Sequence, residues 1–214
     1  MNNLQKRTVT SVVLVTIVLS CLFINSYTWL SLLIIVSLIS LFELINISRK
    51  IWTDKLILFI FSIISFIYLF FFTLITFRAR AWLDFEDILF ILSICILSDV
   101  GGYIVGKIIG GKKLTKISPN KTISGTIGSF LFSLLPLVFI SQNFIKIEFV
   151  TIIWILIISL TCQLGDLFIS YLKRLAKVKD TGSFLTGHGG ILDRIDGIIF
   201  GVPAAFLFWL SIFI

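Results

Sequence analysis

Long, continuously apolar runs occupy most of this 214-residue chain and limit its possible folds more than any other feature. They fall at about residues 8–26, 28–47, 56–77, 88–110, 124–141, 149–172 and 197–214. A helix needs roughly 20 such residues to cross the hydrocarbon of a bilayer. Hydrophobic residues make up 58% of the chain and charged residues 14%, which is too little polar surface for a water-soluble globule. We therefore predict an all-α, polytopic transmembrane helix bundle with about seven spans.

Basic residues cluster in alternate connections between these runs, and this pattern predicts which ends face the cytoplasm. Cytoplasmic loops of membrane proteins carry an excess of lysine and arginine. The connections with this excess contain Lys6, Arg7, Arg49, Lys50, Lys55, Lys112, Lys113, Lys116, Lys121, Lys173, Arg174, Lys177, Lys179 and Arg194. The intervening connections hold Arg78, Arg80 and Lys146 beside acidic residues. We expect a cytoplasmic N-terminus, with most of the net charge of +7 on the side where it favours anionic headgroups and polyphosphates.

Residues that carry chemistry are concentrated in the second half of the chain. Residues 1–87 supply N-terminal transmembrane helices without a recognised motif, and Glu43 is the one charged residue between positions 9 and 47. Residues 88–214 form a C-terminal transmembrane catalytic region with polar cytoplasmic loops at 111–124 and 173–197. The three cysteines, at positions 21, 95 and 162, lie in separate apolar runs and are interpreted as packing residues.

Two acidic residues lie where charge is costly. Asp99 sits inside an apolar run, about 18 Å along a helix from residue 111. An acidic side chain at mid-span costs about 2.5–3.5 kcal/mol on insertion scales, so it should face protein, a cation or water. Asp99 is therefore either a structural residue bonded to a neighbouring helix or part of an active site. Asp166 ends a second apolar run near the cytoplasmic interface, with Ser170 one turn further along the same face.

The run that contains Asp99 continues into a glycine stripe and a basic loop. Gly102, Gly106 and Gly110 recur at every fourth residue, a spacing that lets another backbone approach closely. The loop at 111–122 then carries four lysines and a Ser-Pro-Asn-Lys-Thr sequence, which predicts an ordered turn. By the charge pattern, this loop faces the same compartment as the loop at 173–197.

The loop at 173–197 combines carboxylates, glycines and the chain's single histidine. Asp193 and Asp196 are three residues apart and would share one face of a helix, which makes them a half-site for a hard cation such as Mg²⁺. His188 is bracketed by Gly187, Gly189 and Gly190, which let backbone N–H groups approach an anion. Carboxylates for a metal and lysines for phosphates thus meet on one side of the membrane. This combination is suited to phosphoryl or nucleotidyl transfer.

The pattern of these residues resembles the signature of the phosphatidate cytidylyltransferase family, the CDP-diacylglycerol synthases. The matching residues are Ser170, Lys173, Arg174, Lys179, Asp180, Gly182, His188, Gly189, Gly190, Asp193, Arg194 and Asp196, with the spacing intact over 27 residues. A second block of the family pattern lies upstream. It resembles Asp99, Tyr103, Gly106 and Lys107 of this chain, followed by residues 117–122 and Gly125. The chain departs from the family pattern at Thr186, where proline is usual, and at Asn120, Ile123 and Ser124, where lysine, an aromatic residue and glutamate are usual.

The resemblance implies that CTP and phosphatidate are converted to CDP-diacylglycerol and pyrophosphate by metal-assisted attack of the lipid phosphate on the α-phosphorus of CTP. It assigns metal binding to Asp166 and Asp193, with Asp196 beside them, and Mg²⁺ as the cation; the sequence leaves open whether a second, monovalent cation joins it. The residues expected to act on phosphates in catalysis are Lys173, Arg174, Lys179, His188 and Arg194. The residues expected to contact substrate are Asp99, Lys121, Ser170, Gly189 and Gly190.

The sequence also supports expectations about location and partners. We expect an integral protein of a bacterial inner membrane, surrounded by membrane lipid, with its active site facing the cytoplasm and no nucleic-acid partner. The resemblance implies a homodimer. The alternative is a small membrane transporter that uses Asp99 and Asp166 as coupling sites. Such transporters are commonly built from two related halves, whereas the charged loop at 173–197 has no counterpart in the first half. The enzyme is therefore the preferred hypothesis.

Overall fold

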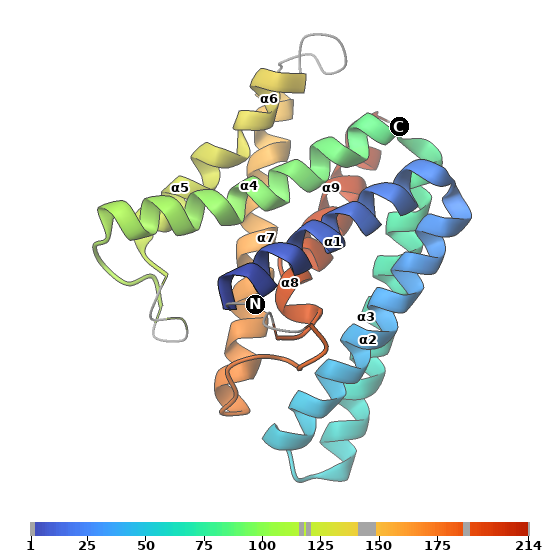
Figure 1. Cartoon of the computed structure of the whole chain (residues 1–214), viewed down its shortest axis with the longest axis vertical. Helices are drawn as coiled ribbons and strands as arrows, with labels where there is room; N and C mark the ends of the chain where they lie inside the picture. Colours follow the sequence, from blue (N-terminus) through green and yellow to red (C-terminus); the bar gives the residue numbers. More distant parts are fainter. Residues whose placement is uncertain (1–2, 116–117, 119–120, 141–148, 186–188, 214) are drawn as a thin grey trace. The chain divides into compact units, whose positions relative to one another are not determined.

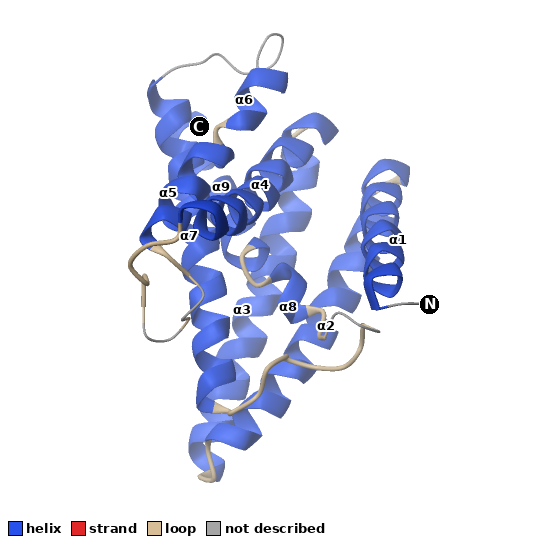
Figure 2. Ribbon diagram, turned by 60° about the vertical axis from the view of Figure 1, so that its left-hand side comes forward, coloured by secondary structure: helices blue, strands red, loops and turns tan. Residues whose placement is uncertain are grey.

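A computed structural model describes residues 3–115, 118, 121–140, 149–185 and 189–213 of the chain. Its helices are α1 (Asn3–Ile24), α2 (Ser26–Ile51), α3 (Lys55–Trp82), α4 (Phe85–Ile109), α5 (Ile123–Ser133), α6 (Leu135–Ile140), α7 (Phe149–Leu175), α8 (Leu192–Ile195) and α9 (Ile198–Phe213) (Figure 1). Loops join them, and the described residues contain no strand beyond two isolated bridges (Figure 2). The all-α prediction is confirmed.

Four helices are long and apolar enough to cross a membrane: α2, α3, α4 and α7. Shorter apolar helical stretches cover Thr8–Ile24, Ile123–Val138 and Ile198–Leu210. Each of the seven apolar runs therefore contains a helix, whereas the number of spans remains a prediction. The fifth run is interrupted between α5 and α6, where Pro136 is the second residue of α6. Proline lacks the N–H that would bond one turn back and disfavours helical geometry at the preceding residue.

The chain forms two compact units. The first unit comprises Met1–Phe85 and Leu172–Ile195, and the second comprises Glu86–Tyr171 and Asp196–Ile214. The loop that follows α7 therefore packs with the N-terminal helices. The sequence-based division at residue 87 assigned that loop to the C-terminal half, and as a functional division it remains a prediction.

Within the first unit, α2 and α3 form an antiparallel hairpin with well-defined helix starts. Asn25 caps α2 by accepting a hydrogen bond from the N–H of Thr28 at 2.8 Å, and Asp54 caps α3 in the same way. Such side chains satisfy N–H groups that have no partner inside the helix. Midway along the hairpin, the buried hydroxyls of Ser37 and Thr73 lie 2.8 Å apart. This hairpin presents Glu43 to the loop that follows α7.

Within the second unit, α4 and α5 cross in close contact through glycines. A Cβ atom at Gly102 would lie 2.5 Å from the Ser129 hydroxyl, and one at Gly125 would lie 2.8 Å from the Gly102 carbonyl oxygen. The predicted stripe thus lets another helix of the same chain approach. Gly110, however, is not one of the tightly packed glycines, because it follows the end of α4 with a positive φ of 64° and an added Cβ atom would meet open space; it contacts α5 through its carbonyl, which accepts the Ser124 hydroxyl. It serves as the left-handed residue that ends the helix.

The cysteine assignment is confirmed for the second unit. Cys95 on α4 and Cys162 on α7 are free and almost completely buried. A Cβ atom at Gly201 on α9 would lie 2.9 Å from the Cys95 sulfur and closer still to that of Cys162. The two thiols fill a tight contact between three helices.

Candidate active site

The end of α7 carries three of the predicted site residues on one side of the helix. Asp166, Ser170 and Lys173 are spaced by four and three residues, so their side chains share a face. The helix ends in a reversed turn in which Lys177 has a positive φ of 54° and the N–H of Val178 donates to the Lys173 carbonyl at 3.0 Å. This bond pattern is a Schellman motif. It directs the chain out of the helix into the loop that leads to Asp193.

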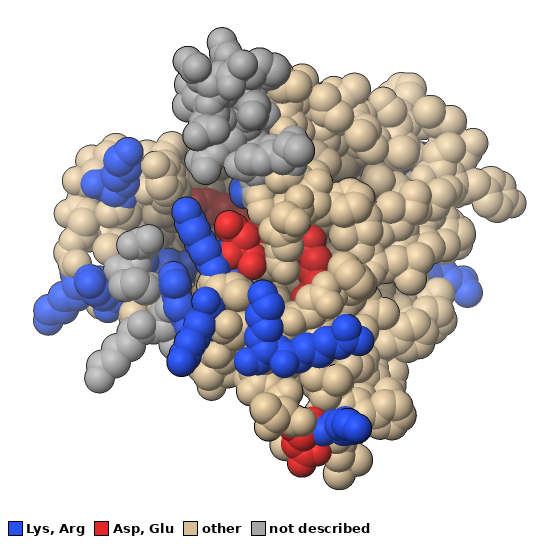
Figure 3. Space-filling model, turned by 60° about the horizontal axis from the view of Figure 1, so that its bottom comes forward, with Lys and Arg blue, Asp and Glu red and all other residues tan. Residues whose placement is uncertain are grey.

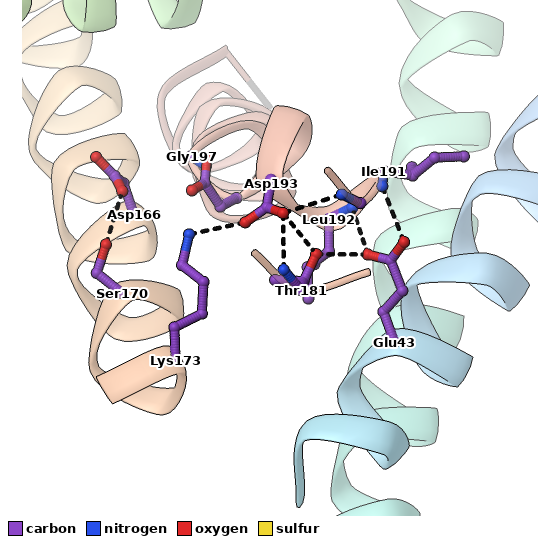
Figure 4. Close-up of polar contacts among 11 residues, drawn as sticks. Glu43, Asp166, Ser170, Lys173, Thr181, Ile191, Leu192, Asp193 and Gly197 are labelled. Carbon is purple, nitrogen blue, oxygen red and sulfur yellow. Dashed lines mark hydrogen bonds and ion pairs between the residues drawn. The ribbon is translucent and has the colours of Figure 1, made fainter. Parts of the chain in front are cut away.

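Asp193 in the first unit is held by three N–H donors and also contacts the Thr181 hydroxyl (Figure 4). Its Oδ1 atom receives the Lys173 ammonium at 2.7 Å. Its Oδ2 atom accepts the N–H of Thr181 at 2.8 Å, the N–H of Gly190 at 3.0 Å and contacts the Thr181 hydroxyl at 3.0 Å. Burial alone would raise the pKa of this carboxyl, but the bonds from Lys173, Thr181 and Gly190 outweigh burial and hold the pKa below its usual value. Asp193 is therefore a firmly oriented anion.

Two glycines of the signature, Gly189 and Gly190, lie against the Asp193 carboxylate. Gly189 has a positive φ of 81°, and a Cβ atom there would lie 2.9 Å from Asp193 Oδ2. Such a backbone conformation favours glycine. The Gly190 N–H donates to Asp193 itself. The sequence predicted that Gly189 and Gly190 contact substrate, and in the structure they surround a carboxylate of the protein.

Glu43 is a site residue that the sequence analysis did not assign. It lies on α2 with 3% of its surface exposed, and its carboxylate accepts hydrogen bonds from the Thr181 hydroxyl and from the N–H groups of Ile191 and Leu192 (Figure 4). The signal was present, because an ionisable residue inside a long apolar run marks a functional position by default. Its partners, however, lie 138 to 149 residues away, and no local motif contains them.

The second unit brings together Lys121, Asp166 and Ser170. The Lys121 ammonium pairs with Asp166 Oδ2, and the Ser170 hydroxyl donates to Asp166 Oδ1 at 3.3 Å. Lys121 is positioned by a closed loop, in which the N–H of Leu114 donates to the Lys121 carbonyl at 2.8 Å. Asp99 lies within electrostatic range of both Asp166 and Lys121. Four predicted residues from three separate parts of the sequence are thus brought together.

The main chain of Asp196 also lies beside α7. A Cβ atom at Gly165 would lie 2.5 Å from the Asp196 carbonyl oxygen, so the glycine before Asp166 permits this contact. The Asp196 side chain accepts the N–H of Gly197 at 3.0 Å. Helix α8 ends at Ile195, and Asp193 and Asp196 belong to different units, so the shared helical face remains a prediction.

The other predicted phosphate-binding residues lie at the surface or outside the described part of the chain. Arg174, Lys179 and Arg194 are exposed. Figure 3 shows lysine and arginine side chains on the surface beside acidic ones. His188, with Thr186 and Gly187, lies outside the described residues, as does Asn120.

The carboxylates fit a hard divalent cation in their chemistry. Asp166 and Asp193 each form an ion pair with the ammonium group of a lysine. In the described residues, no group of three or more histidine, cysteine or acidic side chains is arranged to hold a metal. Mg²⁺ does not require such a cage, because it commonly takes one or two carboxylates and completes its shell with water and phosphate oxygens.

Comparison with known proteins identifies the family of the chain. Residues 50–212 match the sequence model of the cytidylyltransferase family. The chain is 38% identical over 132 residues to a phosphatidate cytidylyltransferase of Helicobacter pylori, covering 58% of this chain and 48% of that protein. It is 45% identical over 123 residues to that of Staphylococcus saprophyticus, covering 54% and 46%.

A third relative comes from another bacterial genus. The chain is 41% identical over 129 residues to the phosphatidate cytidylyltransferase of Rickettsia bellii, covering 55% of this chain and 56% of that protein. The matched region spans about half the length of these curated relatives. The family match itself extends from the end of α2 to α9 and includes every predicted site residue. The chain belongs to the cytidylyltransferase family.

Proposed function

We propose that the protein is a phosphatidate cytidylyltransferase, which converts CTP and phosphatidate to CDP-diacylglycerol and pyrophosphate. Family membership and relatives that carry this name support the proposal. The observation that carries it is the pairing of carboxylates with lysines, Asp166 with Lys121 and Asp193 with Lys173. Nucleotidyl transfer needs acidic oxygens for a metal and cations for phosphates at the same place.

Under this proposal, Asp166 and Asp193 would hold Mg²⁺, and Asp196 would either complete the shell or orient a ligand water. The atom of Asp193 suited to this role is Oδ1, because Oδ2 is occupied by two backbone N–H groups. When bound, the ion would neutralise charge on the triphosphate. The residues themselves supply hard oxygen donors, which Mg²⁺ prefers.

The basic residues would act on the phosphates. With a cation at the carboxylates, the Lys121 and Lys173 ammonium groups would be available to contact phosphate oxygens. Arg174, Lys179 and Arg194 add exposed positive charge, and His188 would contact the leaving pyrophosphate. A phosphatidate oxygen then forms a bond to the α-phosphorus of CTP as the bond to the β-phosphate breaks. No protein nucleophile takes part. Lowering the repulsion between two anionic substrates is the main contribution of these side chains.

The proposal includes a membrane arrangement. Seven spans would place the N-terminus and the loops at 111–124 and 173–197 in the cytoplasm of a bacterium, at its inner membrane. The acyl chains of phosphatidate would stay in the bilayer while CTP arrives from the cytoplasm. A homodimer is the proposed assembly. The lysine-rich composition of these loops supports this orientation.

Replacing Asp193 with asparagine tests the proposal. We expect Asp193→Asn to abolish pyrophosphate release from CTP in the presence of Mg²⁺ and phosphatidate, because an amide binds a divalent cation far more weakly than a carboxylate. Asp54→Asn is the matched control, since Asp54 caps α3 and asparagine caps equally well. Both variants should elute as monodisperse protein in detergent with unchanged helical circular dichroism. Full turnover in Asp193→Asn would contradict the metal assignment, and no turnover in the natural protein would contradict the function.

A further inference from the structure

We infer that Glu43 is a positioning residue for the catalytic loop: it holds the Thr181 hydroxyl and the backbone at Ile191 and Leu192, and so the orientation of the Asp193 carboxylate. Glu43 lies outside the region that matches the family, which begins at residue 50. It comes from α2, whereas the loop follows α7. The role of Asp193 in metal binding rests on the proposed function, but the contacts of Glu43 do not.

Both carboxylate oxygens of Glu43 are directed at the loop. Oε1 accepts the N–H of Ile191 at 3.0 Å, and Oε2 accepts the N–H of Leu192 at 3.0 Å and the Thr181 hydroxyl at 2.7 Å. The N–H groups at the start of a helix have no partner within it, and Leu192 is the first residue of α8. Glu43 therefore satisfies the backbone just before Asp193 from outside the loop.

The Thr181 hydroxyl couples Glu43 to Asp193. Its oxygen lies 2.7 Å from Glu43 Oε2 and 3.0 Å from Asp193 Oδ2, and it has one proton to donate between them. Because the shorter contact is with Glu43, that residue sets the orientation of the hydroxyl. Asp193 Oδ2 is then held mainly by the N–H groups of Thr181 and Gly190, and Oδ1 is left directed at Lys173. This is the oxygen proposed to bind the metal.

Two signature glycines leave the space that this contact occupies. A Cβ atom at Gly182 would lie 2.6 Å from Glu43 Oε1. A Cβ atom at Gly190 would overlap both the Glu43 carboxylate and the Thr181 hydroxyl. Contacts this short do not occur for real side chains, so any other residue would displace the loop or Glu43. The absence of side chains at these positions is thus explained by the buried carboxylate.

The experiment compares Glu43→Gln with Glu86→Gln in the full chain in detergent. Glutamine keeps the shape of glutamate but replaces one acceptor oxygen with a donor, which cannot bind a backbone N–H. Glu86 is exposed in the first turn of α4 and is the matched control. Hydrogen exchange at the Ile191 and Leu192 amides without ligands should accelerate at least about 10-fold in Glu43→Gln, since these two amides lose their acceptors. Exchange in α9 should not change.

Kinetics then separate positioning from a merely structural role. In Glu43→Gln, kcat for CTP-dependent pyrophosphate release should fall about 10–100-fold and the Mg²⁺ concentration for half-maximal rate should rise about 10-fold, as for other residues that orient metal ligands. Glu86→Gln should match the natural protein. Unchanged exchange would overturn the contact, and unchanged kcat and Mg²⁺ requirement with faster exchange would overturn the positioning role.

Two further outcomes are distinguishable. If the natural protein releases no pyrophosphate, the proposed function fails while the exchange data still decide whether Glu43 holds the loop. If Glu43→Gln does not fold, Thr181→Val takes its place, because valine keeps the side-chain shape and leaves Glu43 its two backbone donors. Thr181→Val should raise the Mg²⁺ requirement several-fold without a change in thermal midpoint. Natural kinetics in that variant would overturn the link from Glu43 to Asp193.

Discussion

Lys121 would compete with a metal cation for Asp166, because the two side chains form an ion pair. Its two side chains are 27% and 28% exposed, and pairs of this kind contribute about 0.2–1 kcal/mol. If a cation replaces the lysine, Lys121→Gln should bind Mn²⁺ about 2- to 5-fold more tightly in the absence of nucleotide. The KM for CTP should rise at the same time, because the variant has lost a phosphate-binding charge.

Electron paramagnetic resonance of Mn²⁺ and steady-state kinetics measure these opposite effects in one preparation. Lys112→Gln is the control, since Lys112 is an exposed lysine of the same loop whose carbonyl, and not its side chain, bonds to Ile123. Weaker Mn²⁺ binding in Lys121→Gln would show that the lysine supports the cation and does not compete with it.

Single residues also show why the sequence predicted part of the site and missed the rest. Lys173, Asp193 and the intervening glycines belong to one local pattern, so their spacing revealed them. Glu43 acts through contacts with residues more than 130 positions away, which no spacing encodes. No sequence pattern indicated that the Gly190 N–H would bind Asp193, because an amide that suits a phosphate equally suits a carboxylate.

At the scale of helices, the crossing of α4 and α5 depends on glycines to different degrees. A Cβ atom at Gly128 would lie 2.7 Å from the Gly101 carbonyl oxygen and closer still to Val105, whereas one at Gly106 would lie 3.0 Å from the Thr122 hydroxyl. Gly128→Ala should therefore destabilise the protein by about 1–3 kcal/mol through overpacking. Gly106→Ala should be nearly neutral, because alanine gains about 0.5–1 kcal/mol of helix propensity.

Thermal unfolding of both variants in the same detergent provides the measurement. The order of the two midpoints is the prediction, so each variant is the control for the other. Equal midpoints would mean that the backbone of α5 shifts to admit the extra methyl group at Gly128 as easily as at Gly106.

Helix positions were more predictable than helix continuity. The apolar runs located every long helix because the period and length of a span leave few alternatives. Hydropathy alone does not predict the break between α5 and α6, because it counts Pro136 as one more apolar residue. The early end of α4 at Ile109 likewise follows from Gly110, whose left-handed backbone ends the helix and removes it from the glycine stripe.

For the whole molecule, the charge pattern makes a prediction about the two sides of the membrane that labelling can decide. Arg78 near the end of α3 and Lys112 just after α4 are both exposed and are separated by α4, whose 25 residues extend about 37 Å as a helix. The natural protein serves as the blank for its own cysteines: Cys95 and Cys162 are buried, and Cys21 is half-buried within the apolar helix α1. In sealed inverted vesicles, Lys112→Cys should react with a membrane-impermeant maleimide and Arg78→Cys should not. Right-side-out vesicles should give the reverse. Lysines are retained in the cytoplasm during insertion whichever residues later catalyse a reaction, so the labelling tests topology independently of activity.

Reaction of both variants from one side would mean that α4 does not span, and the reversed pattern would place the loop of Lys121 on the side opposite to cytoplasmic CTP.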